Sequence, residues 1–285
     1  MWRFFRHAAI AFPIAAKILF AAAGVHGAER SVSIGYLQLP GPWLFAVGEG
    51  TFERETGYAI EWVRFETGAK AMQALHDGKV QITYAGSVPT AVAASADADI
   101  ELFYVAADAG SSGALIVNDQ SKIAEPQHLR GKRIGVQFWS LSHYHLLFAL
   151  EQFKITENEV DIYPLTQGET ASHWRDNGLD AAFIRYPGLA QLLPTSRILL
   201  WSETLNRWGK MAFDGFVADR AWSQAHPEFM IKFVEQVAAA NAYYYSVPAR
   251  WTYGSREVRT VARMLGGQPN VVPMLTQIKF PSLDE

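Results

Sequence analysis

The residues best suited to chemistry lie between residues 131 and 150, in the sequence GKRIGVQFWSLSHYHLLFAL. The run Ile134-Gly135-Val136 is typical of a short buried parallel strand, and the segment SLSHY at 140–144 leads from it into a helical pattern of apolar residues. A strand that turns directly into a helix leaves backbone N–H groups unpaired, and that end of the helix carries partial positive charge. The stretch therefore predicts a site for a small anion at a strand–helix junction.

The polar side chains of this stretch are open to two interpretations. Ser140 and Ser142 either donate to the anion or cap the helix, as serine does at many helix starts. His143 is predicted to pack or to face a ligand, because no carboxylate lies near it in sequence and the chain has no GxSxG motif. The nucleotide-binding patterns GxGxxG and GxxxxGK[ST] and the metal-binding spacings HxxxH and HExxH are also missing. We therefore predict no catalytic residue, no metal and no cofactor.

A second strand-to-helix junction lies at Gly86-Ser87, in a turn that Pro89 stiffens. From the residues alone it is either a structural turn or a second half of the anion site. Two helix N-termini that meet at one ligand hold an anion without a full positive charge, which avoids the cost of burying an unpaired cation.

The pattern of apolar and polar residues after residue 28 predicts the helices and strands that position these residues. Apolar runs alternate with helical segments in a βαβα order, which predicts α/β units with sheets of the parallel type. Extended crossings near 107–114 and 211–218 join two such units and predict two lobes with a cleft between them. We expect residues 29–107 in lobe 1, 108–217 in lobe 2, and 218–285 back in lobe 1, with a long amphipathic helix that Pro227 opens.

In α/β proteins with open sheets of this kind, ligands bind outside the carboxyl ends of the strands. Polar or aromatic residues at those ends are the candidate ligand-binding residues. They are Gln38, Gly86, Ser87, Ser111, Ser140, Ser142, His143, Tyr144, Arg185, Tyr186, Trp208 and Asp214. Trp139, Tyr144, Tyr186 and Trp208 are candidate walls that exclude water, although aromatic residues make up 13% of the chain and most are expected in the core.

The N-terminal segment and the composition predict that the protein is exported from the cytoplasm. Residues 1–28 have the basic start, apolar middle and small residues of a secretory signal peptide, and Lys17 within the apolar part argues against a stable membrane span. Removing them takes three basic residues and no acid, which changes the net charge from −3 to −6 and disfavours nucleic acid as a partner. The chain has no cysteine, so it forms no disulfides. We expect an exported, periplasmic monomer.

Three segments resemble one family, the periplasmic solute-binding proteins of sulfonate importers, and most of all the taurine-binding proteins. They are residues 65–69 (FETGA), 78–95 (GKVQITYAGSVPTAVAAS) and 129–150, which contains SLSHY. Trp208-Gly209, Asp214 and His226-Pro227-Glu228 are supporting matches. The resemblance implies a two-lobed, Venus-flytrap fold of type II. It also implies binding of a small sulfonate by lobe closure, and its delivery to a membrane permease and its ATPase for sulfur metabolism.

The sequence departs from the family pattern in three places. Residues 39–41 are apolar, where taurine-binding relatives carry a polar loop. Arg185 stands where relatives usually have an aromatic residue, often Trp. The chain stops soon after Phe280-Pro281, where relatives continue, so we expect it to be truncated relative to the family.

Asp214 stands between apolar neighbours in a strand, where a carboxylate needs a partner. It either pairs with Arg185 or, as the family implies, receives a ligand ammonium. If Arg185 neutralises it, the ligand lacks an amine or has a second acidic group; otherwise Arg185 points to solvent or across the lobe interface. The leading prediction is a binding protein for taurine. The alternatives are another anion, such as an alkanesulfonate or nitrate, and an enzyme of the same fold.

Overall fold

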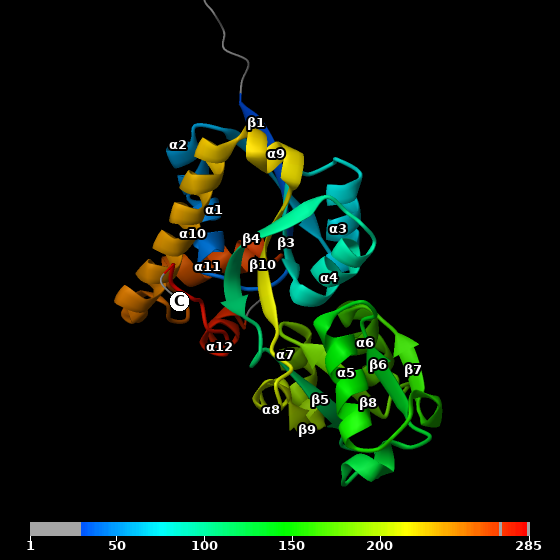
Figure 1. Cartoon of the computed structure of the whole chain (residues 1–285). Coiled ribbons are helices and arrows are strands. Elements are labelled where there is room, and N and C mark those ends of the chain that lie inside the picture. The colour runs from blue at the N-terminus through cyan, green and yellow to red at the C-terminus, as the bar shows by residue number, and fades with distance from the viewer. Residues whose placement is uncertain (1–29, 268–269, 284–285) are drawn as a thin grey trace, which may run out of the picture.

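The computed structural model describes residues 30–267 and 270–283, which form two lobes (Figure 1). Each lobe is built on one five-stranded sheet with helices packed on it. The α/β, two-lobed fold predicted from the sequence is confirmed. The predicted signal peptide at 1–28 lies outside the described residues.

The sheet of the first lobe has the strand order β2-β1-β3-β10-β4. Its strands are β1 (Ser31–Leu37), β2 (Ala59–Phe65), β3 (Ile82–Gly86), β4 (Ile100–Asp108) and β10 (Phe213–Asp219). The sheet of the second lobe has the order β7-β6-β8-β5-β9. Its strands are β5 (Gly113–Asn118), β6 (Arg133–Val136), β7 (Asp161–Pro164), β8 (Ala181–Arg185) and β9 (Ser196–Trp201).

Both sheets are mixed, so the parallel pairing that the sequence predicts is found in only part of each sheet. In the first lobe β1 runs parallel to β2 and β3, but β10 is antiparallel to β3 and β4. In the second lobe β6 is parallel to β7 and β8, but β5 is antiparallel to β8 and β9. The two exceptional strands are those that arrive from the other lobe. Each crosses between the lobes at the carboxyl ends of the parallel strands. It therefore begins at that end of its new sheet and runs antiparallel to the neighbouring parallel strand.

One predicted boundary between the lobes is wrong. The expected end of lobe 2 at residue 217 lies inside β10, and both partners of β10 belong to the first sheet. The chain therefore returns to the first lobe before Phe213. The other crossing, between the end of β4 at Asp108 and the start of β5 at Gly113, lies where the sequence places it.

Helices cover both sheets (Figure 1). Those of the first lobe are α1 (Trp43–Gly48), α2 (Thr51–Thr56), α3 (Gly68–His76), α4 (Ser87–Ser95), α9 (Arg220–Ala225), α10 (Pro227–Ser246), α11 (Arg256–Met264) and α12 (Val271–Thr276), with the 3₁₀ turn η4 (Pro248–Arg250). Those of the second lobe are α5 (Leu141–Gln152), α6 (Gln167–Arg175), α7 (Gly188–Leu192) and α8 (Ser202–Arg207), with the 3₁₀ turns η1 (Pro126–Leu129), η2 (Glu157–Glu159) and η3 (Leu193–Thr195).

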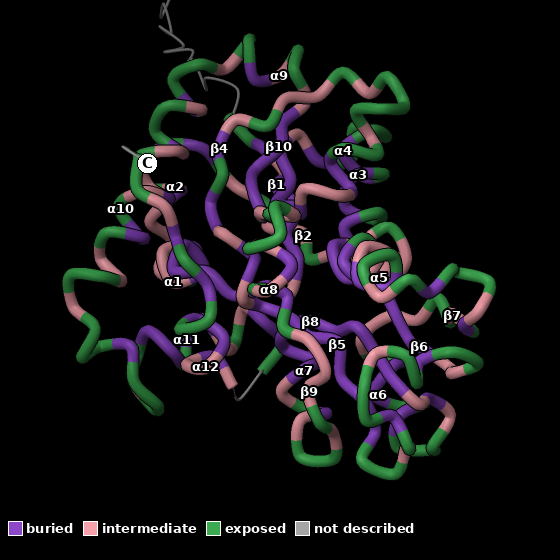
Figure 2. Tube along the Cα trace, turned by 60° about the horizontal axis from the view of Figure 1, so that its bottom comes forward, coloured by how far each residue is buried: buried purple, intermediate pink, exposed green. Residues whose placement is uncertain are grey.

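The central strands are buried in both lobes, as Figure 2 shows. In the first lobe the core is largely aromatic: Phe216 of β10 has its ring 5.1 Å from that of Trp43 and 4.9 Å from that of Phe233. Phe233 lies on α10, the long helix predicted to begin at Pro227. Edge-to-face packing of such rings adds to the burial of their large apolar area. This cluster gives the first lobe a rigid base from which its cleft residues project.

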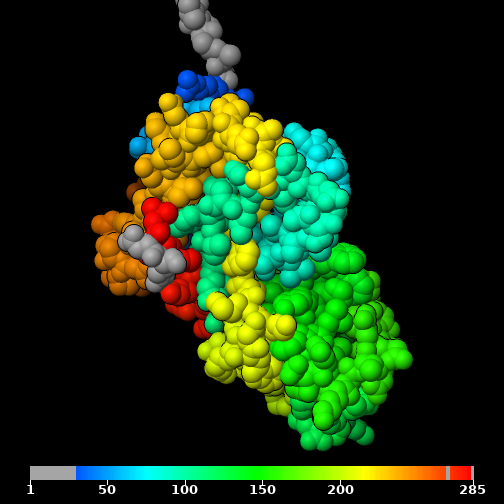
Figure 3. All heavy atoms as spheres, in the orientation of Figure 1, coloured from blue at the N-terminus to red at the C-terminus, as the bar shows by residue number. Residues whose placement is uncertain are grey.

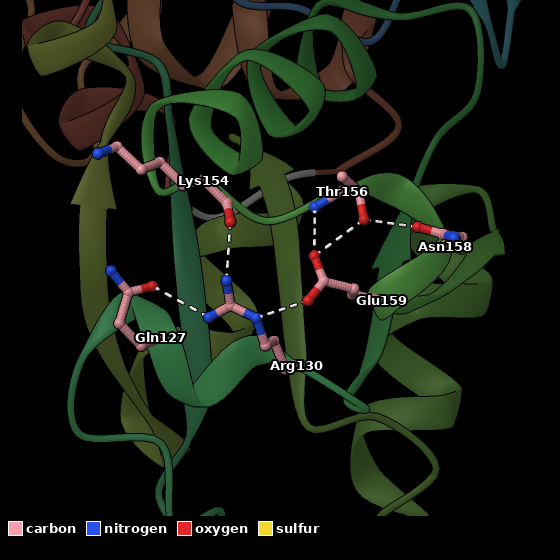
Figure 4. Close-up of polar contacts among 6 residues, drawn as sticks. All are labelled: Gln127, Arg130, Lys154, Thr156, Asn158 and Glu159. Carbon is pink, nitrogen blue, oxygen red and sulfur yellow. Dashed lines mark hydrogen bonds and ion pairs between the residues drawn. The ribbon is translucent and has the colours of Figure 1, made fainter.

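In the second lobe, a network around Arg130 joins the end of the η1 turn to residues 154–159, which follow α5 (Figure 4). The guanidinium donates to the Glu159 carboxylate at 2.7 Å and to the Lys154 carbonyl oxygen at 2.7 Å. Thr156 and Glu159 have the spacing of a capping box in the sequence, and Glu159 accepts from the backbone N–H of Thr156. This backbone hydrogen bond, together with Arg130, lowers the pKa of Glu159 to about 2. The network fixes the C-terminal end of α5, whose other end lies at the cleft.

Within residues 30–267 and 270–283, no helix combines the length and apolar character that a bilayer crossing requires.

Candidate functional site

A cavity of about 230 Å³ lies between the two lobes. Residues of β1, α3, β3 and β10 line it from the first lobe, and residues of α5, α6 and β8 line it from the second. Figure 3 shows the second lobe, in green, directly against the cyan part of the first lobe, and α4 contacts α5 across this boundary. The volume is below the usual range for drug-sized ligands, so the cavity suits a small molecule.

Helix N-termini from both lobes face this cavity. Gly86 precedes the first residue of α4, Ser140 caps α5, and Gln167 begins α6; all three line the cavity. The Ser140 hydroxyl accepts from the His143 backbone N–H at 3.4 Å and donates to the Gln137 carbonyl oxygen at 2.5 Å. Since the first-turn N–H groups of a helix have no partner within it, the three ends give the cavity a positive potential without a net cation.

The inner wall of the cavity is a buried ion pair between Arg185 and Asp214. Arg185 lies at the end of β8 in the second lobe, and Asp214 lies near the start of β10 in the first. The guanidinium donates to Asp214 through both terminal nitrogens, Nη2 to Oδ2 at 2.7 Å and Nη1 to Oδ1 at 3.3 Å. Its Nε donates to the hydroxyl of Ser112 at 2.7 Å. The side chains are 9% and 1% exposed, so the pair is nearly free of solvent.

Two glycines leave room for this pair. A Cβ atom on Gly86 would lie 3.1 Å from Asp214 Oδ1, and one on Gly113 would lie 2.9 Å from Arg185 Cγ. Each glycine is paired in register with the residue whose side chain it accommodates, Gly86 with Asp214 and Gly113 with Arg185. The strand pairing therefore places a glycine opposite each charged residue, which leaves space for the side chains of Arg185 and Asp214 to meet between the two sheets.

Charge pairing favours the charged form of Arg185. Burial by itself lowers the pKa of the Arg185 guanidinium, but the adjacent Asp214 charge outweighs burial and raises it. The hydroxyl of Tyr84 is fully buried nearby, and burial raises its pKa well above the usual value, with a further contribution from Asp214. The inner wall thus has one positive and one negative group, with no net charge.

The structure brings half of the candidate residues to the cavity. Those that line it are Gln38, Gly86, Ser140, Ser142, Arg185 and Asp214. Of the two alternatives for Asp214, the structure has the pair with Arg185, so Arg185 does not point to solvent.

The other six candidates do not line this cavity. Ser87 and Tyr144 line a shallower surface hollow beside Met211. The His143 ring stacks on Phe138 at 4.2 Å, and its Nε2 is buried with no hydrogen-bond partner among the residues that the structure describes. Tyr186 is buried and donates its backbone N–H to the Ser112 carbonyl oxygen. Trp208 is exposed and contacts Phe148, and Ser111 is half-buried beside the residue that does contact Arg185.

Several cavity residues were missed by sequence reasoning. They are Leu37, Leu39, Glu66, Gly68, Pro89, Gln137, Leu141, Leu165, Gln167, Gly168, Thr170, Phe183, Ile184 and Pro187, with Trp139 named only as a wall. A signal for α6 was present: Thr166 and Glu169 have capping-box spacing, and each accepts from the other's backbone N–H.

The arrangement suits binding rather than covalent chemistry. The Ser140 hydroxyl donates to a backbone carbonyl, while the neighbouring His143 ring is held against Phe138. Burial lowers the pKa of His143. Among the described residues, no group of three His, Cys, Asp or Glu side chains is placed to hold a metal ion.

Comparisons with known proteins identify the family of the chain. Residues 50–196 match the family described as ABC transporter, phosphonate, periplasmic substrate-binding protein. The taurine-binding periplasmic protein of Escherichia coli (strain K12) is 33% identical over 247 residues, which cover 87% of this chain and 77% of that protein.

Two solved structures share the fold. The alkanesulfonate-binding protein SsuA from Xanthomonas axonopodis pv. citri, bound to MOPS, superimposes with a TM-score of 0.75 at 20% identity, covering 89% of this chain and 86% of that one. The periplasmic aliphatic sulphonate binding protein SsuA from Escherichia coli gives a TM-score of 0.74 at 22% identity, covering 90% and 87%. The chain therefore belongs to the family of periplasmic solute-binding proteins of sulfonate ABC importers.

Proposed function

We propose that the protein is the substrate-binding component of an ABC importer for a small organosulfonate, which it delivers to a membrane permease and its ATPase. One observation carries the proposal: three helix N-termini from two lobes face one cavity of about 230 Å³ whose inner wall has no net charge. Such a site favours a small monoanion, because the N–H groups supply partial positive charge without a buried lone cation.

Taurine is the ligand that the sequence predicts, and the 33% identity to a protein named taurine-binding supports it as the first compound to test. Taurine is an aminosulfonate, however, and Asp214 is engaged by Arg185. That observation favours a second class of ligand, a sulfonate without an amine.

The proposed mechanism is closure of the two lobes about the crossing segments near residues 108–113 and 208–212, which traps the ligand in a form that docks on the permease. No bond of the ligand is broken. We further propose that the protein acts in the periplasm as a monomer.

Thermal unfolding with a panel of ligands tests the proposal. The panel contains ethanesulfonate, taurine, 2-hydroxyethanesulfonate, methylphosphonate, sulfate and nitrate. A ligand at 100 times its Kd stabilises the folded state by about 2.7 kcal/mol. We expect at least one sulfonate to raise Tm by about 5–10 °C, given the usual slope for chains of this size. Absence of any shift with sulfonates at millimolar concentration, or a shift with methylphosphonate alone, would contradict the proposal.

A further inference from the structure

The inner wall of the cavity has hydrogen-bonding capacity beyond the ion pair itself. A guanidinium has five N–H donors, and a carboxylate has about four acceptor positions. Among the described residues, Arg185 uses three donors, one to Ser112 and two to Asp214. One N–H on each terminal nitrogen is left, and each Asp214 oxygen keeps a further lone pair. Both residues line the cavity.

This wall therefore offers donors and acceptors side by side with no net charge. A ligand ammonium bound to Asp214 would lie next to the guanidinium and be repelled by it. A ligand carboxylate bound to Arg185 would lie next to Asp214 and be repelled in turn. A hydroxyl group avoids both repulsions, because it accepts from an Arg185 N–H and donates to an Asp214 oxygen.

The remaining charged residue that lines the cavity does not alter this balance. Glu66 lies in an exposed ion pair with Lys70, whose Nζ is 2.7 Å from Glu66 Oε2. Apolar side chains, including those of Leu37, Leu39 and Phe183, complete the lining and suit a short alkyl linker. The charge for the sulfonate thus comes from the helix N-termini, and the far end of the ligand meets the neutral pair.

We propose that the ligand is a short hydroxyalkanesulfonate, with 2-hydroxyethanesulfonate as its simplest member, and that Arg185 excludes taurine. This inference rests on the proposed function, since it takes the sulfonate as given and names the group at its other end.

Calorimetric titration of the full mature chain with four ligands on one two-carbon scaffold tests the inference. The ligands are 2-hydroxyethanesulfonate, ethanesulfonate, taurine and sulfoacetate. We expect 2-hydroxyethanesulfonate to bind at least tenfold more tightly than taurine or sulfoacetate, with ethanesulfonate between. Tightest binding of taurine or sulfoacetate overturns the inference and leaves the proposed function standing. Absence of binding by all four overturns both.

Variants of Arg185 and Asp214 test whether this ion pair determines which sulfonate binds most tightly. Arg185→Met leaves Asp214 free to bind an ammonium, so we expect taurine to gain at least tenfold relative to 2-hydroxyethanesulfonate. The double variant Arg185→Met/Asp214→Asn has no charge on the wall, and the two ligands should then bind within about threefold of each other; it serves if the single variant fails to fold. Arg133→Met is the control, because it removes an Arg–Asp pair, Arg133 with Asp180, that lies away from the cavity and is more exposed to solvent. An unchanged ligand ranking in both Arg185 variants overturns the inference.

Discussion

Arg185 and Asp214 illustrate how a buried ion pair acts at the scale of single residues. Two unit charges about 4 Å apart attract by roughly 4 kcal/mol at the effective dielectric of protein sites, while taking each ion out of water costs several kcal/mol. The pair therefore contributes little net stability. Its effect is geometric, since it fixes two donors and two acceptors at the wall of the cavity. Removing one partner strands the other charge and costs about 3–5 kcal/mol in comparable cases.

His145 is the residue whose protonation should couple stability to pH. It is fully buried in α5, and its Nε2 lies 3.1 Å from the Lys210 carbonyl oxygen. Within residues 30–267 and 270–283, its Nδ1 has no hydrogen-bond partner. A second proton would sit on that buried Nδ1, and burial accordingly lowers the pKa from 6.5 to about 4. Because the unfolded chain binds the proton more readily, this contribution to stability is complete above pH 6.5 and is lost as the pH falls to about 4.

We predict that the free energy of unfolding of the wild type falls by about 2 kcal/mol between pH 7 and pH 4.5 on account of this residue. Urea unfolding of wild type and His145→Gln across this range measures it as the difference in pH slope. His128→Gln, which changes an exposed histidine, is the control and should keep the wild-type slope. A His145→Gln slope equal to that of the wild type would show that the residue does not titrate in this range.

At the scale of elements, Ser140 at the N-terminus of α5 allows a capping role to be distinguished from a role in ligand binding. Ser140 caps α5 at the cavity, and Ser255 caps α11, which does not line it, by accepting from the Val258 backbone N–H at 3.2 Å. We expect Ser140→Ala and Ser255→Ala each to cost about 1 kcal/mol of stability, because each helix loses one cap. Only Ser140→Ala should also weaken sulfonate binding, by at least threefold, since the fraying end is the one that faces the ligand.

Denaturant unfolding and calorimetry on the two variants provide the comparison. Equal affinities in Ser140→Ala and the wild type would assign Ser140 a structural role alone. Weaker binding by Ser255→Ala would show instead that the loss follows global stability.

At the scale of the whole molecule, lobe closure should be visible at Trp139. This side chain lines the cavity from the α5 junction, is 59% exposed, and sits on a backbone with φ of 58°. A non-glycine residue in this region is uncommon and is often held there at a functional site. As the lobes close, the indole should leave water, so saturating sulfonate is expected to shift the tryptophan emission to shorter wavelength and to reduce quenching by acrylamide.

Trp139→Phe distinguishes this residue from the other tryptophans of the chain. The variant should lose most of the spectral change while calorimetry still detects ligand binding. A full spectral change in the variant would mean that Trp139 stays exposed in the complex.

The local features of this protein could be read from its sequence. The strand-to-helix junction before Leu141, the capping box at Thr156 and the helix that begins at Pro227 all depend on residues a few positions apart, and the structure confirms each. The two-lobed α/β fold followed from the alternation of such elements together with the family resemblance. Asp214 was also identifiable, because a carboxylate among apolar neighbours in a strand requires a partner.

Other features depended on tertiary structure. Ser112, rather than the predicted ligand-binding residue Ser111, accepts from the Arg185 side chain. Both serines lie in the turn between β4 and β5, and the pattern of the sequence does not specify which side chain of that turn faces the second lobe. The third helix N-terminus at the cavity, that of α6, came into place only through the packing of the second lobe.

The sequence by itself therefore determined the strand-to-helix junction at the start of α5 and the need of Asp214 for a partner. Tertiary structure alone decided which partner that is. Arg185 and Asp214 lie in different sheets, and they meet because β5 and β10 cross between the lobes and place Gly113 and Gly86 opposite them. Since this contact joins strands through long-range pairing rather than local spacing, no pattern in the chain could have chosen between a bound arginine and a ligand ammonium.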